Sequence, residues 1–409
     1  MNNNPALKRI EIVDALRGFA LAGIVIVHMV ENYLAAPVPE GAMEASHQGV
    51  LDYVVDGFIL LILRGKFFAL FSFLFGLSFF IQMDKARQKG LNFGGRFLWR
   101  LLLLLVIGYF HSLFYRGDIL TVYALLGILL IPFYKLNNTW VLGICALLFL
   151  GLGRSLIFIF FHGDNLFVTG ELMPDSPLII EYYNILTNGS LLDVFKTNAW
   201  DGHIMKMDFQ LGIFSRGYLT FGFFLLGLFV GRIQFFRNFL SYGTKIKHVL
   251  YGSLGLFLLS IIVGFFFFAQ LAPNVTFDNW YAMNGLTAFD LNNLAMTMII
   301  LCLFLMAYKR GKLKRWLEKF IPYGRMALTN YIVQSIIGTF IFYGWGLGYL
   351  GEIRNIYIFF ISLTFIVLQM IFSAWWMRNF YYGPFEWLWR SLTYFRIFPM
   401  RKPEKKVMQ

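Results

Sequence analysis

The chain has 409 residues, of which 58% are hydrophobic, 19% aromatic and only 14% charged. About a quarter of the residues in a soluble domain are charged, so this composition excludes an ordinary water-soluble enzyme. The formal charge of +13 could attract nucleic acid, but Lys and Arg lie in short segments between apolar runs, the distribution that orients helices in a membrane. We therefore expect the lipid bilayer, and no nucleic acid, as the partner of this chain.

Long apolar runs recur from residue 12 to residue 382. A bilayer core about 30 Å thick needs about 20 apolar residues per helix. We therefore predict an all-α, polytopic integral membrane protein with a single transmembrane domain over residues 1–409. About ten transmembrane helices are expected, at residues 12–34, 66–83, 97–115, 118–135, 139–161, 211–231, 247–270, 285–308, 326–344 and 355–380.

Lysine and arginine gather on one side of this predicted topology. The segments on that side hold 27 of the 35 Lys and Arg, counting Arg17 within the first helix. They include Lys8, Arg9 and a basic C-terminal tail at about 383–409. Because positively charged loops are retained in the cytoplasm, we expect a multi-pass protein of the cytoplasmic (inner) cell membrane with both termini in the cytoplasm.

Two stretches depart from a simple series of hairpins. From Asp52 to Met83 the apolar pattern would make a helix of about 45 Å, too long for one upright span, and Arg64-Gly65-Lys66 is the expected break. We expect residues 51–63 to form an external helix that is re-entrant or lies at the membrane interface. The second stretch is an external loop insertion at about 162–210, where an amphipathic part around 178–208 predicts short helices over the outer mouth.

Charged residues inside the predicted first helix form one stripe. At 100° per residue, Asp14, Arg17 and His28 fall within an arc of about 60°. The predicted third helix repeats the spacing, because Arg100 and His111, like Arg17 and His28, are eleven residues apart. Charged side chains within a span are costly, so each is a candidate functional residue.

Two interpretations of these side chains are open. In the first, Arg17, Arg96 and Arg100 hold an anionic donor, such as the phosphates of an acyl-CoA, on the cytoplasmic side. His28, or His111, then acts as general base on an acceptor hydroxyl or amine. In the second, the arginines snorkel to the inner boundary, and the two histidines are satisfied polar groups of the core.

Other polar residues of the predicted spans also have alternative roles. Asp118, at the outer turn after the third helix, either orients His111 or caps the fourth helix. Asn330 and Gln334 lie one turn apart in the ninth helix, where amides commonly hold helices together. Lys66 begins the second spanning helix and is interpreted as an interface anchor.

The cysteines and the remaining histidines give no sign of a metal site. Cys145 and Cys302 lie inside apolar runs, without Cys or His neighbours at metal-ligand spacing, and are expected to be small core hydrophobes. His47, His162, His203 and His248 show no metal-binding spacing either. We therefore predict no metal and no bound cofactor, with acyl-CoA only as a co-substrate.

Several motifs resemble those of the YeiB-like membrane proteins, a family of unknown function also called domain of unknown function 418. They are IVDALRGFA at 12–20, GKFFALFSFLFG at 65–76, GDIL at 117–120, GRMALTNY at 324–331 and GPFEWLWR at 383–390. Together they cover nearly the whole chain. This resemblance supplies no activity.

The spacing of Arg17 and His28 also resembles the Arg-x10-His pattern in the first helix of the acyltransferase-3 proteins, a wider group of ten-helix transmembrane acyltransferases. That resemblance implies that His28 takes part in transferring an acyl group from a cytoplasmic donor to an acceptor, often a sugar. We therefore favour a membrane-bound acyltransferase whose acceptor is a glycan, a lipid or a small molecule. The alternatives are a transporter or exporter of a small amphiphile or metabolite and a non-catalytic scaffold, in which Arg17 and His28 would tolerate replacement.

Overall fold

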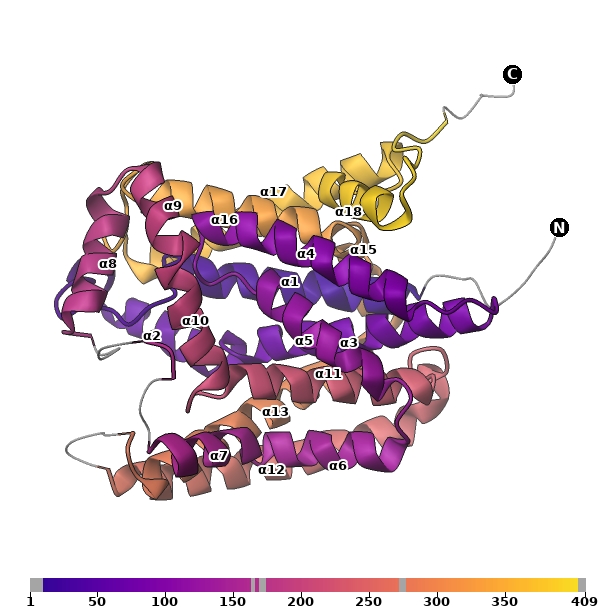
Figure 1. Cartoon of the computed structure of the whole chain (residues 1–409), viewed down its shortest axis with the longest axis horizontal. Coiled ribbons are helices and arrows are strands. Elements are labelled where there is room, and N and C mark those ends of the chain that lie inside the picture. Colours follow the sequence, from indigo (N-terminus) through magenta and orange to yellow (C-terminus); the bar gives the residue numbers. More distant parts are fainter. Residues whose placement is uncertain (1–9, 163–165, 169–173, 272–276, 404–409) are drawn as a thin grey trace.

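A computed structural model describes residues 10–162, 166–168, 174–271 and 277–403. Within these ranges the chain is helical, and its only strand-like pairing is a single bridge between Phe380 and Arg401. The long helices run side by side along the longest axis of the molecule (Figure 1). The predicted all-α class is therefore confirmed. Lys8, Arg9 and the last part of the predicted basic tail lie outside the described residues.

The predicted spans correspond to helices in the structure. These are α1 (Glu11–Val30), α3 (Lys66–Arg87), α4 (Gly94–Phe114), α5 (Leu120–Phe133), α6 (Asn138–Phe149), α7 (Leu152–Phe161), α11 (Arg216–Arg232), α12 (Gly243–Ala269), α13 (Trp280–Tyr308), α16 (Ala327–Phe342) and α17 (Asn355–Asn379). Shorter helices connect them: α2 (Val50–Phe58), α8 (Pro177–Asn188), α9 (Leu191–Ala199), α10 (Asp201–Leu211), α14 (Gly311–Leu317), α15 (Phe320–Arg325) and α18 (Pro384–Tyr394), with single turns at Glu44–Ser46, Ile59–Leu63 and Phe239–Tyr242.

By length and composition, 6 helices of the described chain can cross a membrane, or up to 8 if each bent pair of helices is one span. The bent pairs are α6 with α7, at 55°, and α10 with α11, at 63°. α5 and α16 are apolar but shorter. The chain is thus a multi-pass membrane protein, while the number of ten crossings stays a prediction. The continuous helix expected at 139–161 is broken at Gly151, whose φ of +77° ends α6 and starts α7.

The break expected near residue 64 is also present. α2 passes into a π-helical turn, in which the Arg64 amide donates to the Ile59 carbonyl over 2.7 Å. Gly65 then has a φ of +79°, a conformation that glycine adopts without strain, and α3 begins at Lys66. The predicted segment 51–63 is therefore helical and meets α3 at this break, although by length and composition residues Val50–Arg87 count as one candidate span of 38 residues.

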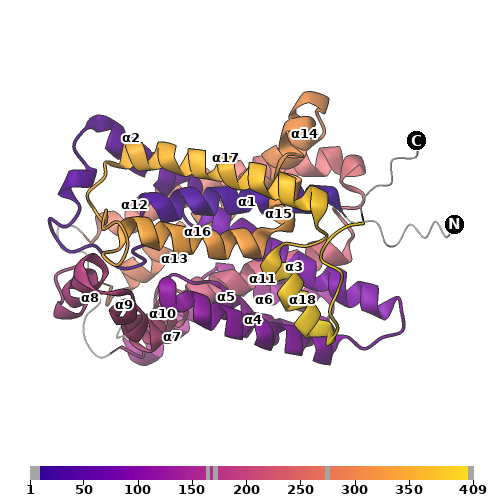
Figure 2. The same cartoon turned by 90° about the horizontal axis from the view of Figure 1, so that it is seen from above.

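The two ends of the helix bundle differ in what covers them. α2, α8 and α9 lie at one end, and α14, α15 and α18 lie at the other (Figures 1 and 2). The predicted loop insertion at 162–210 consists of the short helices α8, α9 and α10, apart from residues 163–165 and 169–173, which lie outside the described part. We call the end with α14, α15 and α18 the basic end, because lysine and arginine concentrate there.

Glycines allow the helices around the first span to pack backbone to backbone. A methyl group on Gly18 of α1 would overlap the carbonyl oxygen of Phe320, and one on Gly324 of α15 would overlap that of Asp14. Close approach through small residues is a common way for membrane helices to pack. This contact brings Arg325, next to Gly324, beside the charged stripe of α1.

Candidate functional site

A cavity of about 1170 Å³ runs inside the helix bundle. Side chains of α1, α3, α4, α5, α11 and α16 line it, together with parts of the connecting segments. Its lining extends from Lys85 and Arg325 near the basic end to His47 and Asp56 near the opposite end. A single cavity therefore lies along the bundle and is lined at both of its ends by charged residues.

Arg17 lines this cavity near the basic end. It donates hydrogen bonds of 2.9 Å to the Asp14 carboxylate and to the Ser78 hydroxyl. Arg325 of α15 lies 3.6 Å from the other carboxylate oxygen of Asp14. Asp14 therefore holds two arginines in place at the cavity wall and is itself buried, at 3% exposure.

Arg100 of α4 lines the same part of the cavity. Its guanidinium lies 3.6 Å from the centre of the Trp389 ring, and the Trp389 indole donates to the Arg100 carbonyl over 2.8 Å. Stacking on an aromatic face suits arginine better than lysine. Arg96 lies over the Tyr394 ring, at 5.3 Å, and is not among the cavity-lining residues.

Positive charge exceeds negative charge in this region. The cavity-lining cations are Arg17, Lys85, Arg100, Arg237 and Arg325, and the carboxylates are Asp14 and Glu386. The carboxylate of Glu386 is occupied, because it accepts bonds from the backbone of Leu328 and Thr329 and from the Thr329 hydroxyl at the start of α16. The basic part of the cavity thus suits a polyanion such as the phosphates of a nucleotide.

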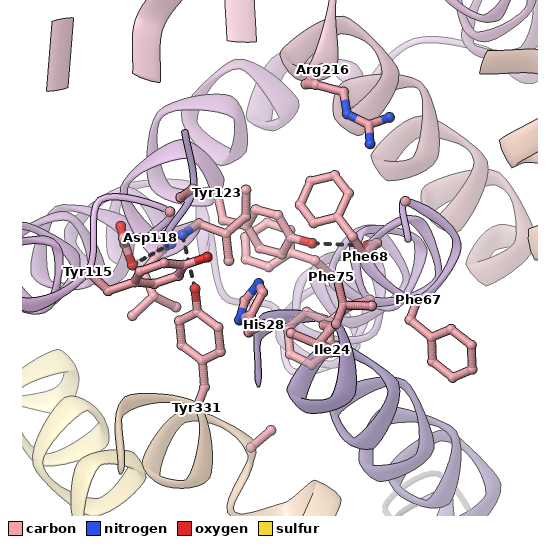
Figure 3. Close-up of a pocket in the computed structure, with 18 of the residues that line it drawn as sticks. Ile24, His28, Phe67, Phe68, Phe75, Tyr115, Asp118, Tyr123, Arg216 and Tyr331 are labelled. Carbon is pink, nitrogen blue, oxygen red and sulfur yellow. Dashed lines mark hydrogen bonds between the residues drawn. The ribbon is translucent and has the colours of Figure 1, made fainter. Parts of the chain in front are cut away.

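His28 lies in the middle of the cavity, where aromatic rings surround it (Figure 3). Its ring centre is 5.4 Å from that of Tyr33, 5.2 Å from that of Tyr115 and 6.5 Å from that of Tyr331. Its Nδ1 is buried and has no hydrogen-bond partner among the described residues. An imidazole in apolar surroundings favours its neutral form, the form that accepts a proton.

His111 and Asp118 form a buried pair. The His111 Nδ1 lies 2.8 Å from the Asp118 carboxylate, and their side chains are 1% and 0% exposed. The same carboxylate accepts from the backbone amides of Leu120 and Thr121 at the start of α5. Asp118 therefore has both of the roles weighed for it: it orients His111 and it caps α5.

The two histidines approach one tyrosine from different directions. The Tyr331 ring lies 6.5 Å from that of His28 and 5.0 Å from that of His111. His28 and Tyr331 line the cavity, whereas His111 does not. His111 therefore contacts Tyr331 from the side away from the cavity, whereas His28 faces the cavity itself.

The other predicted polar residues hold helices together or lack partners. Asn330 donates to the Tyr323 carbonyl and to the Ser373 hydroxyl, which joins α15, α16 and α17. Gln334 is fully buried, and its amide atoms have no partner among the described residues. Lys66 is 1% exposed and donates to the Leu60 carbonyl over 2.7 Å. None of the three lines the cavity.

Many cavity-lining residues were not predicted as site residues, and four of them bear on the chemistry of the cavity. Tyr115 and Tyr331 were counted with the general aromatic content, although Tyr331 belongs to the motif at 324–331. Arg216 falls within the helix predicted at 211–231 and was not named as a candidate. Glu386 belongs to the motif at 383–390, and a carboxylate within an otherwise aromatic and basic segment was the signal that could have identified it.

Within the described chain, Cys145 and Cys302 are buried free thiols, and no three His, Cys, Asp or Glu side chains gather closely enough to hold a metal ion.

Comparison with known proteins gives two kinds of match. The profile of a family described as "Protein of unknown function (DUF418)" matches residues 230–396. The profile described as "Heparan-alpha-glucosaminide N-acetyltransferase, catalytic" matches residues 9–187. The second match contains the predicted site residues of the first half of the chain, namely Asp14, Arg17, His28, Lys66, Arg96, Arg100, His111 and Asp118.

Three relatives match over almost their full length. The chain is 29% identical to "Uncharacterized protein YxaH" of Bacillus subtilis, with 97% of each chain covered. It is 30% identical to "Uncharacterized 39.9 kDa protein in amylase 3'region" of Bacillus acidopullulyticus, with 96% of each covered. It is 27% identical to "Uncharacterized protein YeiB" of Escherichia coli, with 95% of this chain and 97% of the relative covered.

Proposed function

The chain belongs to the DUF418 family of membrane proteins, and we propose that it is a transmembrane acyltransferase. The donor is an acyl-CoA that enters the cavity from the basic end, and the acceptor is a hydroxyl or amine that enters from the opposite end. One observation carries this proposal: a single cavity joins a group of arginines to a half-buried histidine, His28. The resemblance of residues 9–187 to an N-acetyltransferase catalytic domain supports it.

Arg17 and Arg100 have the geometry that a phosphate site needs. Asp14 and Ser78 fix Arg17, and Trp389 fixes Arg100, so little side-chain entropy remains to be lost on binding. In our proposal these two arginines bind the phosphates of the donor. The apolar middle of the cavity, with Ile24 and several aromatic rings, then accepts the acyl end.

His28 is the proposed general base. Its imidazole takes the proton from the acceptor hydroxyl or amine while the acceptor oxygen or nitrogen bonds to the thioester carbonyl carbon. The carbon–sulfur bond then breaks, and the thiolate of CoA leaves and takes up the proton from His28. His111, held by Asp118, acts as a positioning residue that supports Tyr331.

We further propose that the basic end faces the cytoplasm of a cell membrane. Positive loops are retained there, and acyl-CoA is a cytoplasmic metabolite in this scheme. Both described ends of the chain, the start of α1 and the region after α18, lie at the basic end (Figure 2), which agrees with termini on one side of the membrane.

A transporter of a small amphiphile is the second candidate. The cavity favours it because its lining reaches both ends of the bundle, as a translocation pathway requires. The two candidates differ in one consequence: a transporter moves its substrate unchanged, whereas an acyltransferase converts acyl-CoA to CoA.

Binding and turnover of acetyl-CoA by the protein purified in nanodiscs test the proposal. Removing one charged phosphate contact costs about 1.5–3 kcal/mol, so Arg17→Gln and Arg100→Gln are expected to weaken binding by about 10- to 100-fold. Arg87→Gln is the matched control, because Arg87 is exposed and lies outside the cavity. Absence of acyl-CoA binding by monodisperse wild type, or equal affinity in all four proteins, would overturn the donor site.

A further inference from the structure

Two interrupted helices bring their N-terminal ends together on one wall of the cavity. α3 begins at Lys66, directly after the turn at Gly65, and α11 begins at Arg216, after the 63° bend that separates it from α10. A Cβ on Gly65 would lie 3.1 Å from the Arg216 Nη2 and 2.9 Å from the Asn293 Oδ1. We call this group of Arg64, Gly65, Lys66, Arg216 and Asn293 the helix-break cluster.

The helix-break cluster has more positive than negative charge. Glu31 pairs with Arg64, and Asp290 pairs with Arg154. Arg216 lies 3.9 Å from the second oxygen of that same Asp290. Four cations, including Lys66, thus share two carboxylates among the described residues around this cluster.

The Arg64 side chain is half exposed, but Lys66, Arg154 and Arg216 are largely buried around one carboxylate, Asp290, and excess charge of this kind is expensive inside a membrane protein. Among the described residues, the Lys66 ammonium donates one hydrogen bond, to the Leu60 carbonyl. It also lies 5.7 Å from the centre of the Phe289 ring. The N-terminal ends of α3 and α11 add partial positive charge from their backbone amides. An anion bound here would offset the charge of the cluster.

Asn293 is an independent sign of a missing ligand. It is 0% exposed, and neither its Oδ1 nor its Nδ2 has a hydrogen-bond partner among the described residues. Buried amides are almost always hydrogen-bonded, because an unmet donor or acceptor has lost its water without a replacement. Its side chain points at the Gly65 turn, where the two helix ends meet. Its Oδ1 lies nearest the turn in the structure, and a half-turn of the amide would place the Nδ2 group there to donate to a ligand oxygen.

We propose that the helix-break cluster binds the anionic group, a phosphate or a carboxylate, of the acceptor. This inference rests on the proposed acyltransferase function, because it names the chemical class of the second substrate. Interrupted helices whose N-terminal ends face an anionic group are a known solution for binding inside membranes. Arg64, Gly65 and Arg216 line the same cavity as His28, and Figure 3 shows Arg216 and His28 on different walls of it.

The position of the cluster separates it from the donor site. Arg64 pairs with Glu31, which follows His28 toward the end opposite the basic end. Phe67 and Phe68 line the cavity next to Gly65, so an apolar surface adjoins the anion site. The acceptor is therefore an anionic amphiphile whose reactive hydroxyl or amine reaches His28 while its charge stays at Arg216.

The test measures binding of dihexanoyl-phosphatidic acid and of inorganic phosphate to the purified protein, with dihexanoylglycerol as the uncharged comparison. Wild type is expected to bind dihexanoyl-phosphatidic acid but not dihexanoylglycerol. Additional binding of inorganic phosphate identifies a soluble phosphate compound as the source of the anion, and its absence identifies a lipid headgroup. Arg216→Gln is expected to weaken binding by about 10- to 100-fold, and Arg87→Gln to leave it unchanged.

Asn293→Asp keeps the inference testable if Arg216→Gln does not fold. The new carboxylate would take the place of the ligand, so this variant is expected to unfold at a higher temperature than wild type and to lose phosphatidic acid binding. A merely structural asparagine predicts the opposite change in stability. Binding of both charged probes equally by wild type and a folded Arg216→Gln, or no binding by wild type, would overturn the site.

The same protein distinguishes this inference from the function on which it rests. Arg216-dependent binding of the charged probe without any acyl-CoA turnover leaves the anion site intact and refutes the acyltransferase. Turnover of acyl-CoA with no effect of Arg216→Gln on charged-probe binding refutes the anion site alone.

Discussion

Replacement of Asp118 by alanine tests how much the buried Asp118–His111 pair stabilises the protein. The carboxylate binds the His111 ring, caps α5 through two backbone amides and lies 3.8 Å from the Lys206 ammonium. Loss of a helix cap costs about 1 kcal/mol, and removing one partner of a buried ion pair costs about 3–5 kcal/mol. Asp118→Ala is therefore expected to lose about 4–6 kcal/mol of stability, and Asp118→Asn, which can still accept at the cap, about half of that.

Thermal unfolding in detergent, followed by tryptophan fluorescence, measures this loss. Asp193→Ala is the matched control, because Asp193 is exposed and caps α9 through hydrogen bonds to Ser190 alone within the described chain. A much larger decrease in the unfolding temperature is expected for Asp118→Ala than for this control. Equal decreases would refute the reasoning, because they would reduce Asp118 to a helix cap.

Three further predictions concern packing, pH and the donor. A methyl group on Gly76 would overlap a backbone carbonyl of α11, whereas Gly252 faces open space. Gly76→Ala is therefore expected to lose about 3 kcal/mol of stability or more, and Gly252→Ala to be at least as stable as wild type. Similar unfolding temperatures for the two variants would contradict this packing. Burial lowers the pKa of His47, but a backbone carbonyl and the Asp56 carboxylate outweigh burial and hold the pKa above its usual 6.5. The stability that protonated His47 contributes is therefore full below about pH 6.5 and lost as the pH rises through the folded-state pKa, so His47→Gln should destabilise the protein more at about pH 5.5 than at about pH 9; a pH-independent difference would refute it. Arg100→Lys, which loses the planar stack, is expected to weaken acyl-CoA binding about tenfold, and unchanged affinity would exclude Arg100 from the donor site.

The sequence predicted the fold class well because apolar runs and basic loops are properties of each segment alone. It predicted the break at Gly65 from the excess length of one run, and the structure confirms that break. It did not predict the break at Gly151, and it began the span after the external insertion at residue 211, whereas α11 begins at Arg216. The break at Gly151 depends on packing against another helix, at Thr287, and such a contact leaves no periodic signal.

The candidate site was predictable only where it depends on positions within one helix. The helical stripe placed Arg17 and His28 on one face, and both line the cavity. The equal spacing of Arg100 and His111 suggested an equal arrangement in α4, but only Arg100 lines the cavity. The His111 ring instead pairs with the carboxylate of Asp118, which lies in the connection between α4 and α5. Which face of α4 meets the cavity is decided by neighbouring helices, which spacing within α4 does not encode.

The anion site shows a second limit of sequence reasoning. Arg216 and Asn293 are 77 positions apart along the chain, and each alone resembles an interface residue or a helix-packing amide. Their relevance appears only where the turn at Gly65 brings them together. A site built from helix interruptions therefore needs the tertiary arrangement to be recognised.

Turnover of acetyl-CoA at saturating concentration by wild type and His28→Gln is the most direct measurement of the proposed chemistry. Loss of a general base lowers the rate by about 10²- to 10⁴-fold, so the variant is expected to bind acetyl-CoA like wild type and to release CoA at least about a hundred times more slowly. His248→Gln is the control, because His248 is exposed on α12 and lies outside the cavity. Equal turnover by wild type and His28→Gln would contradict the proposal that His28 is the base.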